Sequence, residues 1–178
     1  MNAKAKPRPL HNSSDYRVAE EERRFRTVAT GGTFDRLHRG HEALLSKSFE
    51  VGQKVVIGVT SDAFALKEGK RPEQRYDERV RALRAYIRRA FPSRPYEISK
   101  LDDYFGPGIA SAEVEAIVVS SETAKRVELA NRLRAEKGFP PLNVITVGFV
   151  LADDGKPISS TRIRSGEIDQ VGRVLKGS

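Results

Sequence analysis

Residues 28–45 read VATGGTFDRLHRGHEALL, and the predicted fold is organised around this stretch. The short apolar run leads into Gly31 and Gly32, where a side chain would block a tight turn or a close ligand. His38 and His41 are three residues apart, so they would share one face if that segment is helical. A helix that opens here presents free amide groups and the positive end of its dipole to an anion. The pattern therefore predicts a phosphate-bearing ligand at the end of the first strand.

On both sides of this stretch, short apolar runs alternate with amphipathic segments. Helices are predicted at 42–51, 76–91, 122–137 and from 159 onward, and strands at 25–30, 54–60, 96–98, 116–119 and 143–150. This alternation is typical of βαβ units with right-handed crossovers. We therefore predict an α/β chain, a Rossmann-like three-layer fold with a five-stranded parallel sheet.

Ligands in such a sheet bind beyond the carboxyl ends of the strands. The unusual segments of this chain all fall at those ends, and the stretch after the second strand reads as a polar loop. These segments are 31–41, 61–71, 120–123 and 159–164. Their convergence predicts one shared site.

The 178 residues suffice for one well-buried domain and are short for two. We predict a mobile N-terminal arm at 1–24 and a single domain at 25–178. The N-terminus lacks the apolar core of a secretory signal, and no apolar run approaches the about 18 residues that cross a membrane. The absence of cysteine excludes disulfides, thiolate metal sites and a cysteine nucleophile, and it fits a cytoplasmic protein. The net charge of +8 suggests a nucleotide, phosphorylated metabolite or nucleic acid as partner, although a solvated basic surface fits the charge equally well.

The motifs limit the chemistry further. His38 and His41 could supply two zinc ligands, but a zinc site takes three or four, and the remaining histidine is His11 in the predicted arm. We therefore expect no metal site in the protein. The Ser-Ser-Thr run at 159–161 could cap the amides of a helix or hold phosphate oxygens. Neither a G-x-G-x-x-G fingerprint, nor a P-loop, nor a Gly-x-Ser-x-Gly elbow is present.

A phosphate site in this chain must then be built from imidazoles, hydroxyls, helix amides and basic side chains. Such groups suit phosphoryl or nucleotidyl transfer, in which positioning and electrostatics carry the rate. A phosphate acceptor is already ionised at neutral pH. The lack of an obvious general base is therefore consistent with this chemistry.

Two segments carry a resemblance to a known family. The stretch TGGTFDRLHRGH at 30–41 is similar to the T/HxGH signature of the nucleotidyltransferase superfamily, and ISSTRIR at 158–164 is similar to its ISSTxxR signature. Within it, the chain most resembles archaeal and eukaryotic phosphopantetheine adenylyltransferases, through GVTSD at 58–62, VVSSET at 118–123 and ANRLRAEKG at 130–138. The resemblance covers roughly residues 25–165, which makes 25–178 a nucleotidyltransferase domain.

The resemblance implies an activity and roles for individual residues. The activity is conversion of ATP and 4′-phosphopantetheine to dephospho-CoA and pyrophosphate, with Mg²⁺ bound mainly through the ATP phosphates. It implies catalytic roles for His41, His38 and a lysine, Lys70 or its competitor Lys67. It implies substrate contacts for Gly31, Gly32, Thr33, Phe34, Ser120, Ser121, Glu122, Ser159, Ser160, Thr161 and Arg162. We expect Arg71 and Arg164 to be surface charges.

Bacterial members carry an Arg-Gly-Leu-Arg run where this chain has Ser-Ser-Glu-Thr at 120–123, so a bacterial-style hexamer is not assumed. We expect a monomer or a small homo-oligomer, with no nucleic-acid or membrane partner. Other enzymes on the same scaffold remain alternatives: an FAD synthetase, a cytidylyltransferase or a nicotinamide mononucleotide adenylyltransferase. An RNA-binding module is a less favoured alternative from a different functional class.

Overall fold

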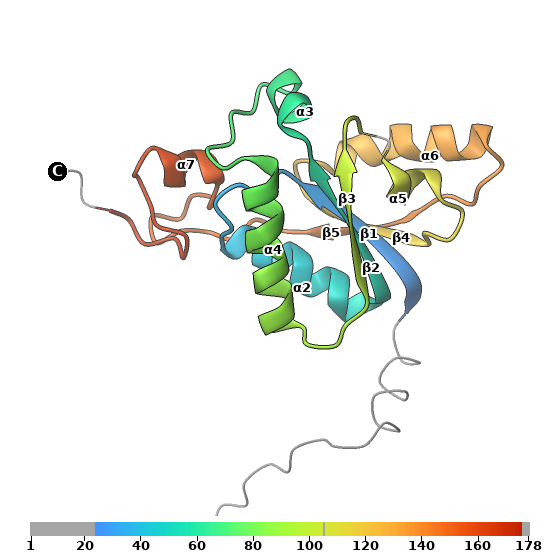
Figure 1. Ribbon diagram of the computed structural model, residues 1–178, viewed down its shortest axis with the longest axis horizontal. Coiled ribbons are helices and arrows are strands. Elements are labelled where there is room, and N and C mark those ends of the chain that lie inside the picture. Colours follow the sequence, from blue (N-terminus) through green and yellow to red (C-terminus); the bar gives the residue numbers. More distant parts are fainter. Residues whose placement is uncertain (1–23, 105, 176–178) are drawn as a thin grey trace, which may run out of the picture.

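The computed structural model describes residues 24–104 and 106–175, which form a five-stranded parallel sheet flanked by helices (Figure 1). The strand order is β3-β2-β1-β4-β5, and every neighbouring pair is parallel. The strands are β1 (Phe25–Gly32), β2 (Gly52–Thr60), β3 (Tyr96–Leu101), β4 (Ala116–Ser120) and β5 (Asn143–Val147). The predicted five-stranded parallel sheet is therefore confirmed. The arm predicted at 1–24 lies outside the described residues except for its last position.

Helices cover both faces of the sheet, which confirms the three-layer architecture. On one face, α2 (Arg39–Val51) and α4 (Tyr76–Ala90) bury Leu45, Phe49, Leu83 and Ile87 against β1, β2 and β4. On the other face, α5 (Pro107–Ala110) and α6 (Val127–Glu136) cover a smaller core that includes Val127. The last helix, α7 (Ser160–Arg164), lies at the opposite end of the molecule from α6 (Figure 1).

Several elements differ from the sequence prediction: α2 begins at Arg39 rather than at residue 42, β3 continues to Leu101 rather than ending at 98, and α5 is an additional short helix. The predicted polar loop after β2 contains a short helix, α3 (Asp62–Lys67), because Ser61 caps its start and Phe64 turns into the core. The predicted helix at 122–137 begins later, with the 3₁₀ turn η1 (Ala124–Arg126) before α6. The last strand ends at Val147 rather than at residue 150. Among the described residues, no helix is both long enough and apolar enough to span a bilayer.

Candidate active site

His38 stands immediately before α2 and caps it. Its Nδ1 atom accepts a hydrogen bond from the Gly40 amide at 3.1 Å, and its backbone is extended, as the cap position requires. The side chain is buried, with 6% of it exposed. Burial lowers the pKa of His38 from 6.5 to about 4, and the nearby charge of Asp35 opposes this shift only in part. His38 is therefore neutral at pH 7, and because Nδ1 accepts, its proton is on Nε2.

Gly40 makes this cap possible. A β-carbon at that position would lie 3.0 Å from Cε1 and 3.1 Å from Nδ1 of His38, closer than side chains normally approach. It would also lie 3.8 Å from the carbonyl oxygen of Ile158, in the segment that precedes α7. The start of α2 is therefore packed closely on two sides.

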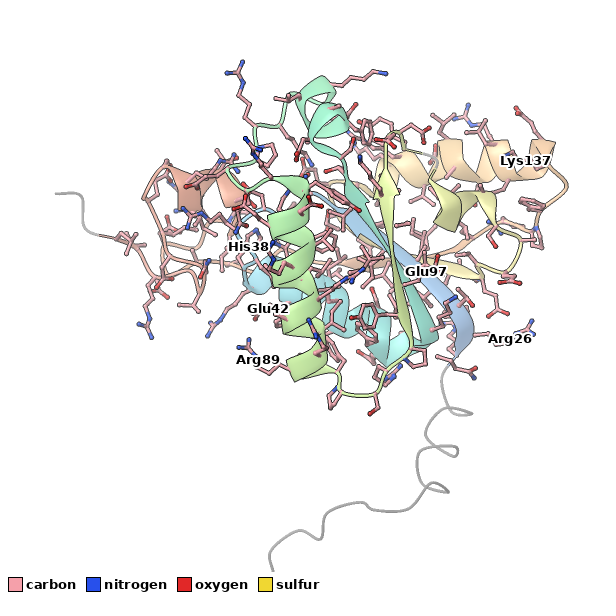
Figure 2. All side chains as sticks on the ribbon, in the orientation of Figure 1. Arg26, His38, Glu42, Arg89, Glu97 and Lys137 are labelled. Carbon is pink, nitrogen blue, oxygen red and sulfur yellow. The ribbon has the colours of Figure 1, made fainter. Side chains whose placement is uncertain are left out.

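His41, in the first turn of α2, stacks on His38 with ring centroids 3.9 Å apart and planes 26° apart. The Phe34 ring packs against it at 5.2 Å. Burial, followed by the neighbouring His38 and the charge of Lys70, lowers the pKa of His41 well below its ordinary value. Its Nδ1 atom is shielded from solvent and has no hydrogen-bond partner among the described residues. The two neutral rings thus form one stacked unit, and His38 lies at the end of α2 nearest α7 (Figure 2).

The segment around α7 lies in contact with the first loop, which is the connection between β1 and α2 at residues 33–38. The Ser160 hydroxyl donates a hydrogen bond to the carbonyl oxygen of Asp35 at 2.7 Å. Nη1 of Arg164 pairs with Oδ2 of Asp35, also at 2.7 Å. The two segments that the sequence predicted to surround one triphosphate therefore meet. Arg164 is not the surface charge that the sequence suggested, because the carboxylate that it pairs with is buried.

The remaining groups of the Ser-Ser-Thr run have distinct partners. Ser159 caps α7 by accepting from the Arg162 amide at 3.3 Å. Thr161 is exposed and accepts from Nη2 of Arg164 at 3.2 Å. The guanidinium of Arg162 pairs with the carboxylates of Asp154 and Glu167, so its charge is compensated within the C-terminal segment.

Arg79 of α4 joins the loops that follow β1 and β2. Its guanidinium is fully buried and donates to the carbonyl oxygens of Thr33 and Thr60, while its Nε donates to that of Gln74 at 3.1 Å. It also pairs with Asp62 at 2.7 Å. Burial alone would raise the pKa of Asp62, but hydrogen bonds from Arg79 and from the Tyr76 amide lower it below its ordinary value. Arg79 thus holds Thr33 beside Thr60, whose hydroxyl oxygens are 3.3 Å apart.

An apolar cleft of about 160 Å³ opens beside this site, on the face of the sheet that carries α5 and α6. Its walls come from β1, β2, β3 and β4 and from α3, α5 and α6, and include Ala29, Gly31, Gly32, Gly58, Thr60, Phe64, Leu101, Ile109, Ile117, Val119 and Ala130. A β-carbon on Gly58 would lie 2.6 Å from the Leu101 side chain, so that glycine is what lets Leu101 lie across the sheet. Lys70 and Lys67 are both exposed, but Lys70 lines the cleft and Lys67, at the end of α3, does not.

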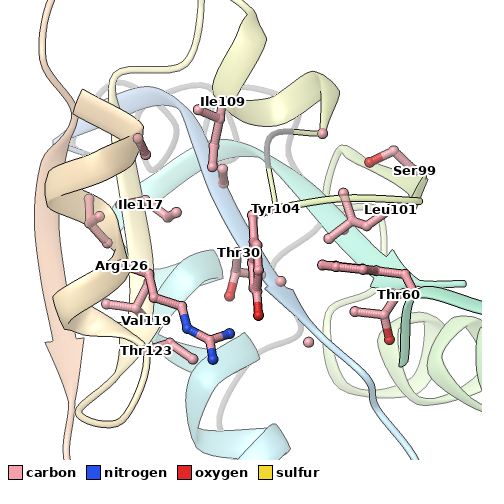
Figure 3. A pocket seen from close by; sticks show the side chains of 18 of the residues that line it. Thr30, Thr60, Ser99, Leu101, Tyr104, Ile109, Ile117, Val119, Thr123 and Arg126 are labelled. Atoms are coloured by element: carbon pink, nitrogen blue, oxygen red, sulfur yellow. The ribbon is translucent and has the colours of Figure 1, made fainter. Parts of the chain in front are cut away.

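Three side chains from separate elements meet over the cleft. The Arg126 guanidinium lies 4.5 Å from the centre of the Tyr104 ring and 3.5 Å from the Glu68 carboxylate. Figure 3 shows Arg126 and Tyr104 directed toward each other across the cleft. This contact links the β4 side of the cleft to its β3 side, and covers part of its opening.

Ser120 is the last residue of β4, and Ser121 and Glu122 follow it. None of the three lines the apolar cleft. The Ser120 hydroxyl lies 3.1 Å from that of Thr123, and the Ser121 amide donates to the Val147 carbonyl at 3.3 Å. Glu122 is exposed. Within 24–104 and 106–175, no group of three or more His, Cys, Asp or Glu side chains is arranged to hold a metal ion.

Sequence reasoning missed Asp35 and Arg79 as organisers of the site. Asp35 stood inside the quoted motif, and Arg79 in the amphipathic pattern of the second predicted helix. Arg79 lies four residues before Leu83 and eight before Ile87, so the three residues share the buried face of α4. That periodicity was the available signal for a buried charge.

Comparisons with known proteins agree with this geometry. A family model described as cytidylyltransferase-like matches residues 29–166, from β1 through α7. A phosphopantetheine adenylyltransferase from Methanopyrus kandleri is 48% identical over 147 residues, which make up 83% of this chain and 93% of that protein. The chain belongs to the phosphopantetheine adenylyltransferase family.

A second phosphopantetheine adenylyltransferase, from Methanothermobacter thermautotrophicus, is 46% identical over 154 residues, covering 86% of this chain and 92% of that protein. Among solved structures, a protein of unknown function from Archaeoglobus fulgidus matches with a TM-score of 0.62 and 32% identity, over 68% of this chain and 88% of that one. Membership of the phosphopantetheine adenylyltransferase family confirms the resemblance inferred from the two signature segments.

Proposed function

We propose that this chain transfers the adenylyl group of ATP to 4′-phosphopantetheine, giving dephospho-CoA and pyrophosphate in coenzyme A synthesis. The observation that carries the proposal is the contact between the first loop and the α7 segment beside an apolar cleft. The two relatives named for this activity support the identity of the substrates.

In the proposed reaction, an oxygen of the acceptor phosphate attacks the α-phosphorus of ATP. The bond from that phosphorus to the oxygen bridging to the β-phosphate breaks, and pyrophosphate leaves with the electron pair. Because the attacking oxygen is already ionised, no general base is required. The protein then needs only to position the two phosphates and to stabilise the charge that develops between them.

The described contacts support a separate role for each of the catalytic groups. His38 uses Nδ1 as a cap acceptor, so its Nε2–H is the group left to donate to a phosphate oxygen. His41 is neutral and stacks on His38, which suits a donor to the α-phosphate in the transition state. Lys70 supplies positive charge, since it lines the cleft and affects the pKa of His41.

The substrates are assigned to the two sides of this centre. Thr33, next to the glycine turn and beside Thr60, would contact the acceptor phosphate and the nucleotide, and the 159–161 run the β- and γ-phosphates. Ser120, Ser121 and Glu122 stay assigned to the substrate by resemblance. Mg²⁺ enters as part of the ATP complex, as a component of the substrate. The apolar walls of the cleft suit the long neck of pantetheine, with Arg126 and Tyr104 over its opening.

The test is a substrate panel with the purified chain. ATP·Mg²⁺ is offered with 4′-phosphopantetheine, FMN or nicotinamide mononucleotide, and CTP with a phosphorylated alcohol, while pyrophosphate and the adenylylated product are measured. We expect dephospho-CoA and pyrophosphate only from the first pair. FAD formation without turnover of 4′-phosphopantetheine would identify an FAD synthetase instead, and salt-dependent RNA binding without turnover would favour the RNA-binding module.

The same assay separates the two lysines. Lys70→Ala should lower kcat/KM by about tenfold to a hundredfold, as expected for loss of a charged contact to phosphate. Lys67→Ala is the matched comparison, because it removes the same charge from the neighbouring exposed position. A greater loss in Lys67→Ala than in Lys70→Ala would transfer the phosphate contact to Lys67.

A further inference from the structure

The Asp35 carboxylate is buried between the first loop and α7, with 1% of the residue exposed. The amides of Glu73 and Gln74 donate to its two oxygens at 3.2 and 3.0 Å. Nη1 of Arg164, 129 positions later in the chain, completes its set of partners at 2.7 Å. A buried carboxylate with this many donors is fixed in orientation, and it fixes the guanidinium opposite it.

The backbone around Asp35 is held in an uncommon conformation. Phe34 and Arg36, the residues on either side, have φ values of +53° and +48°. Non-glycine residues rarely adopt this left-handed region, and such conformations persist only where their surroundings hold them. Two contacts do so: Arg36 pairs with Glu73 at 2.6 Å, and the Arg36 amide donates to the side chain of Gln74 at 3.0 Å. The loop is therefore braced in the geometry that turns Asp35 toward α7.

The Asp35 contacts also separate the roles of the Ser160 and Thr161 hydroxyls. The Ser160 hydroxyl donates its hydrogen bond to the Asp35 carbonyl oxygen, so its proton is not available to a ligand. The Thr161 oxygen instead accepts from Nη2 of Arg164 at 3.2 Å, so its own proton remains available. Arg164 thus forms a bridge from the Asp35 carboxylate to the Thr161 hydroxyl.

We infer that Asp35 is a positioning residue for ATP. Through Arg164 it holds the Thr161 hydroxyl next to the first loop, as a donor to the triphosphate. The inference rests on the proposed function in that it takes ATP as the nucleotide. Asp35 itself does not touch substrate. Its effect passes through Arg164, so the two residues form one functional unit.

The test compares Asp35→Asn with Glu97→Gln in the full chain. Asp35→Asn keeps the shape of the side chain and removes its charge. Glu97→Gln removes an exposed ion pair with Lys54, between β3 and β2, and leaves the contacts around Asp35 and α7 untouched. For each variant, KM is measured separately for ATP and for 4′-phosphopantetheine, ATP binding is measured by calorimetry without acceptor, and folding is measured by urea titration.

For Asp35→Asn we expect KM and Kd for ATP to rise by about tenfold to a hundredfold, the cost of losing a charged hydrogen bond. KM for 4′-phosphopantetheine should change by less than about twofold, and Glu97→Gln should bind ATP like the wild type. A purely structural role would lower the folded fraction and leave both KM values unchanged. That outcome, or an unchanged Kd for ATP, would overturn the inference.

A double variant tests the bridge itself. Asp35→Asn/Arg164→Gln should bind ATP no more weakly than the weaker single variant, because residues that act as one unit are not additive. If the losses of ATP affinity in the two single variants multiply in the double variant, the inference is overturned. If Asp35→Asn does not fold, Arg164→Gln and Thr161→Val are compared in the same way. The calorimetric result can be distinguished from the result of the substrate panel. A chain that binds ATP but does not adenylylate 4′-phosphopantetheine would reject the proposed function and leave the inference about Asp35 intact.

Discussion

The buried, neutral state of His38 predicts a specific dependence of stability on pH. An unfolded chain exposes this imidazole, which then titrates at the ordinary value of 6.5, whereas in the folded protein its pKa is about 4. Protons therefore bind the unfolded state preferentially between these two values. The His38 contribution is fully present above pH 6.5 and is lost as the pH falls toward 4.

The size of the effect follows from the gap between the two pKa values. That gap, 6.5 minus about 4, is about 2.5 pH units, and at about 1.4 kcal/mol for each unit the full loss is about 3 kcal/mol. Between pH 7 and pH 5 the loss from this residue alone should be about 2 kcal/mol. Such a change is a large part of the stability of a small domain.

The assay is urea unfolding of the wild type and His38→Asn at a series of pH values from 7 to 5. Asparagine can still cap α2, but it does not titrate in this range. Other groups, such as Asp62 with its lowered pKa, are shared by both proteins and cancel in the difference. The difference in unfolding free energy should move by about 2 kcal/mol in favour of the variant as the pH falls.

The third histidine supplies a matched control. His11 belongs to the arm predicted from the sequence, so His11→Asn should differ from the wild type by an amount that does not depend on pH. A constant difference for His38→Asn as well would refute the conclusion that His38 is buried and neutral. Selective labelling of the imidazole nitrogens would report the expected Nε2–H tautomer directly.

Further substitutions test other parts of the site. His41→Ala should lower kcat by about 10² to 10³, as for loss of one transition-state donor, and leave the urea midpoint unchanged. Gly40→Ala should displace the His38 ring and lower kcat about tenfold, while stability changes by less than about 1 kcal/mol, because the helix propensity gained offsets the cap lost. Arg79→Met should lower the unfolding free energy by about 3–5 kcal/mol in urea titrations, since it leaves three carbonyl groups without donors. Arg26→Met, which breaks an exposed ion pair, should cost less than about 1 kcal/mol.

The sheet could be predicted from the sequence because its strands are continuous apolar runs separated by periodic helices. Burial on both faces makes such runs conspicuous, and β2 and β4 are buried along most of their length. The short helix α3 could not be recognised in the same way. Its six residues make fewer than two turns, so Phe64 and Ala65 show no helical period, and the flanking charges read as a loop.

The candidate site could be predicted as a place but not as a set of contacts. Strand ends converge in any parallel sheet, so its position followed from topology. The capping role of His38 did not follow, since helix caps are usually Ser, Thr, Asp or Asn. Arg164 was expected at the surface because the sequence does not distinguish an arginine paired with a buried carboxylate from a solvated one. Its partner is 129 positions away, and only the folded chain brings the two together.

The neutral histidines and the buried ion pairs reflect one electrostatic requirement. Two cationic imidazoles stacked at 3.9 Å would repel each other and Lys70. Carboxylates that neutralised them would in turn repel phosphates. Neutral imidazoles can still donate hydrogen bonds to phosphate oxygens without that cost. Asp35, the nearest buried carboxylate, is compensated by Arg164 and two amides and so presents little net charge to an anion. In the proposed reaction, Lys70 and the oriented donors would attract the two phosphate-bearing substrates, while the buried Asp35 holds the loops together.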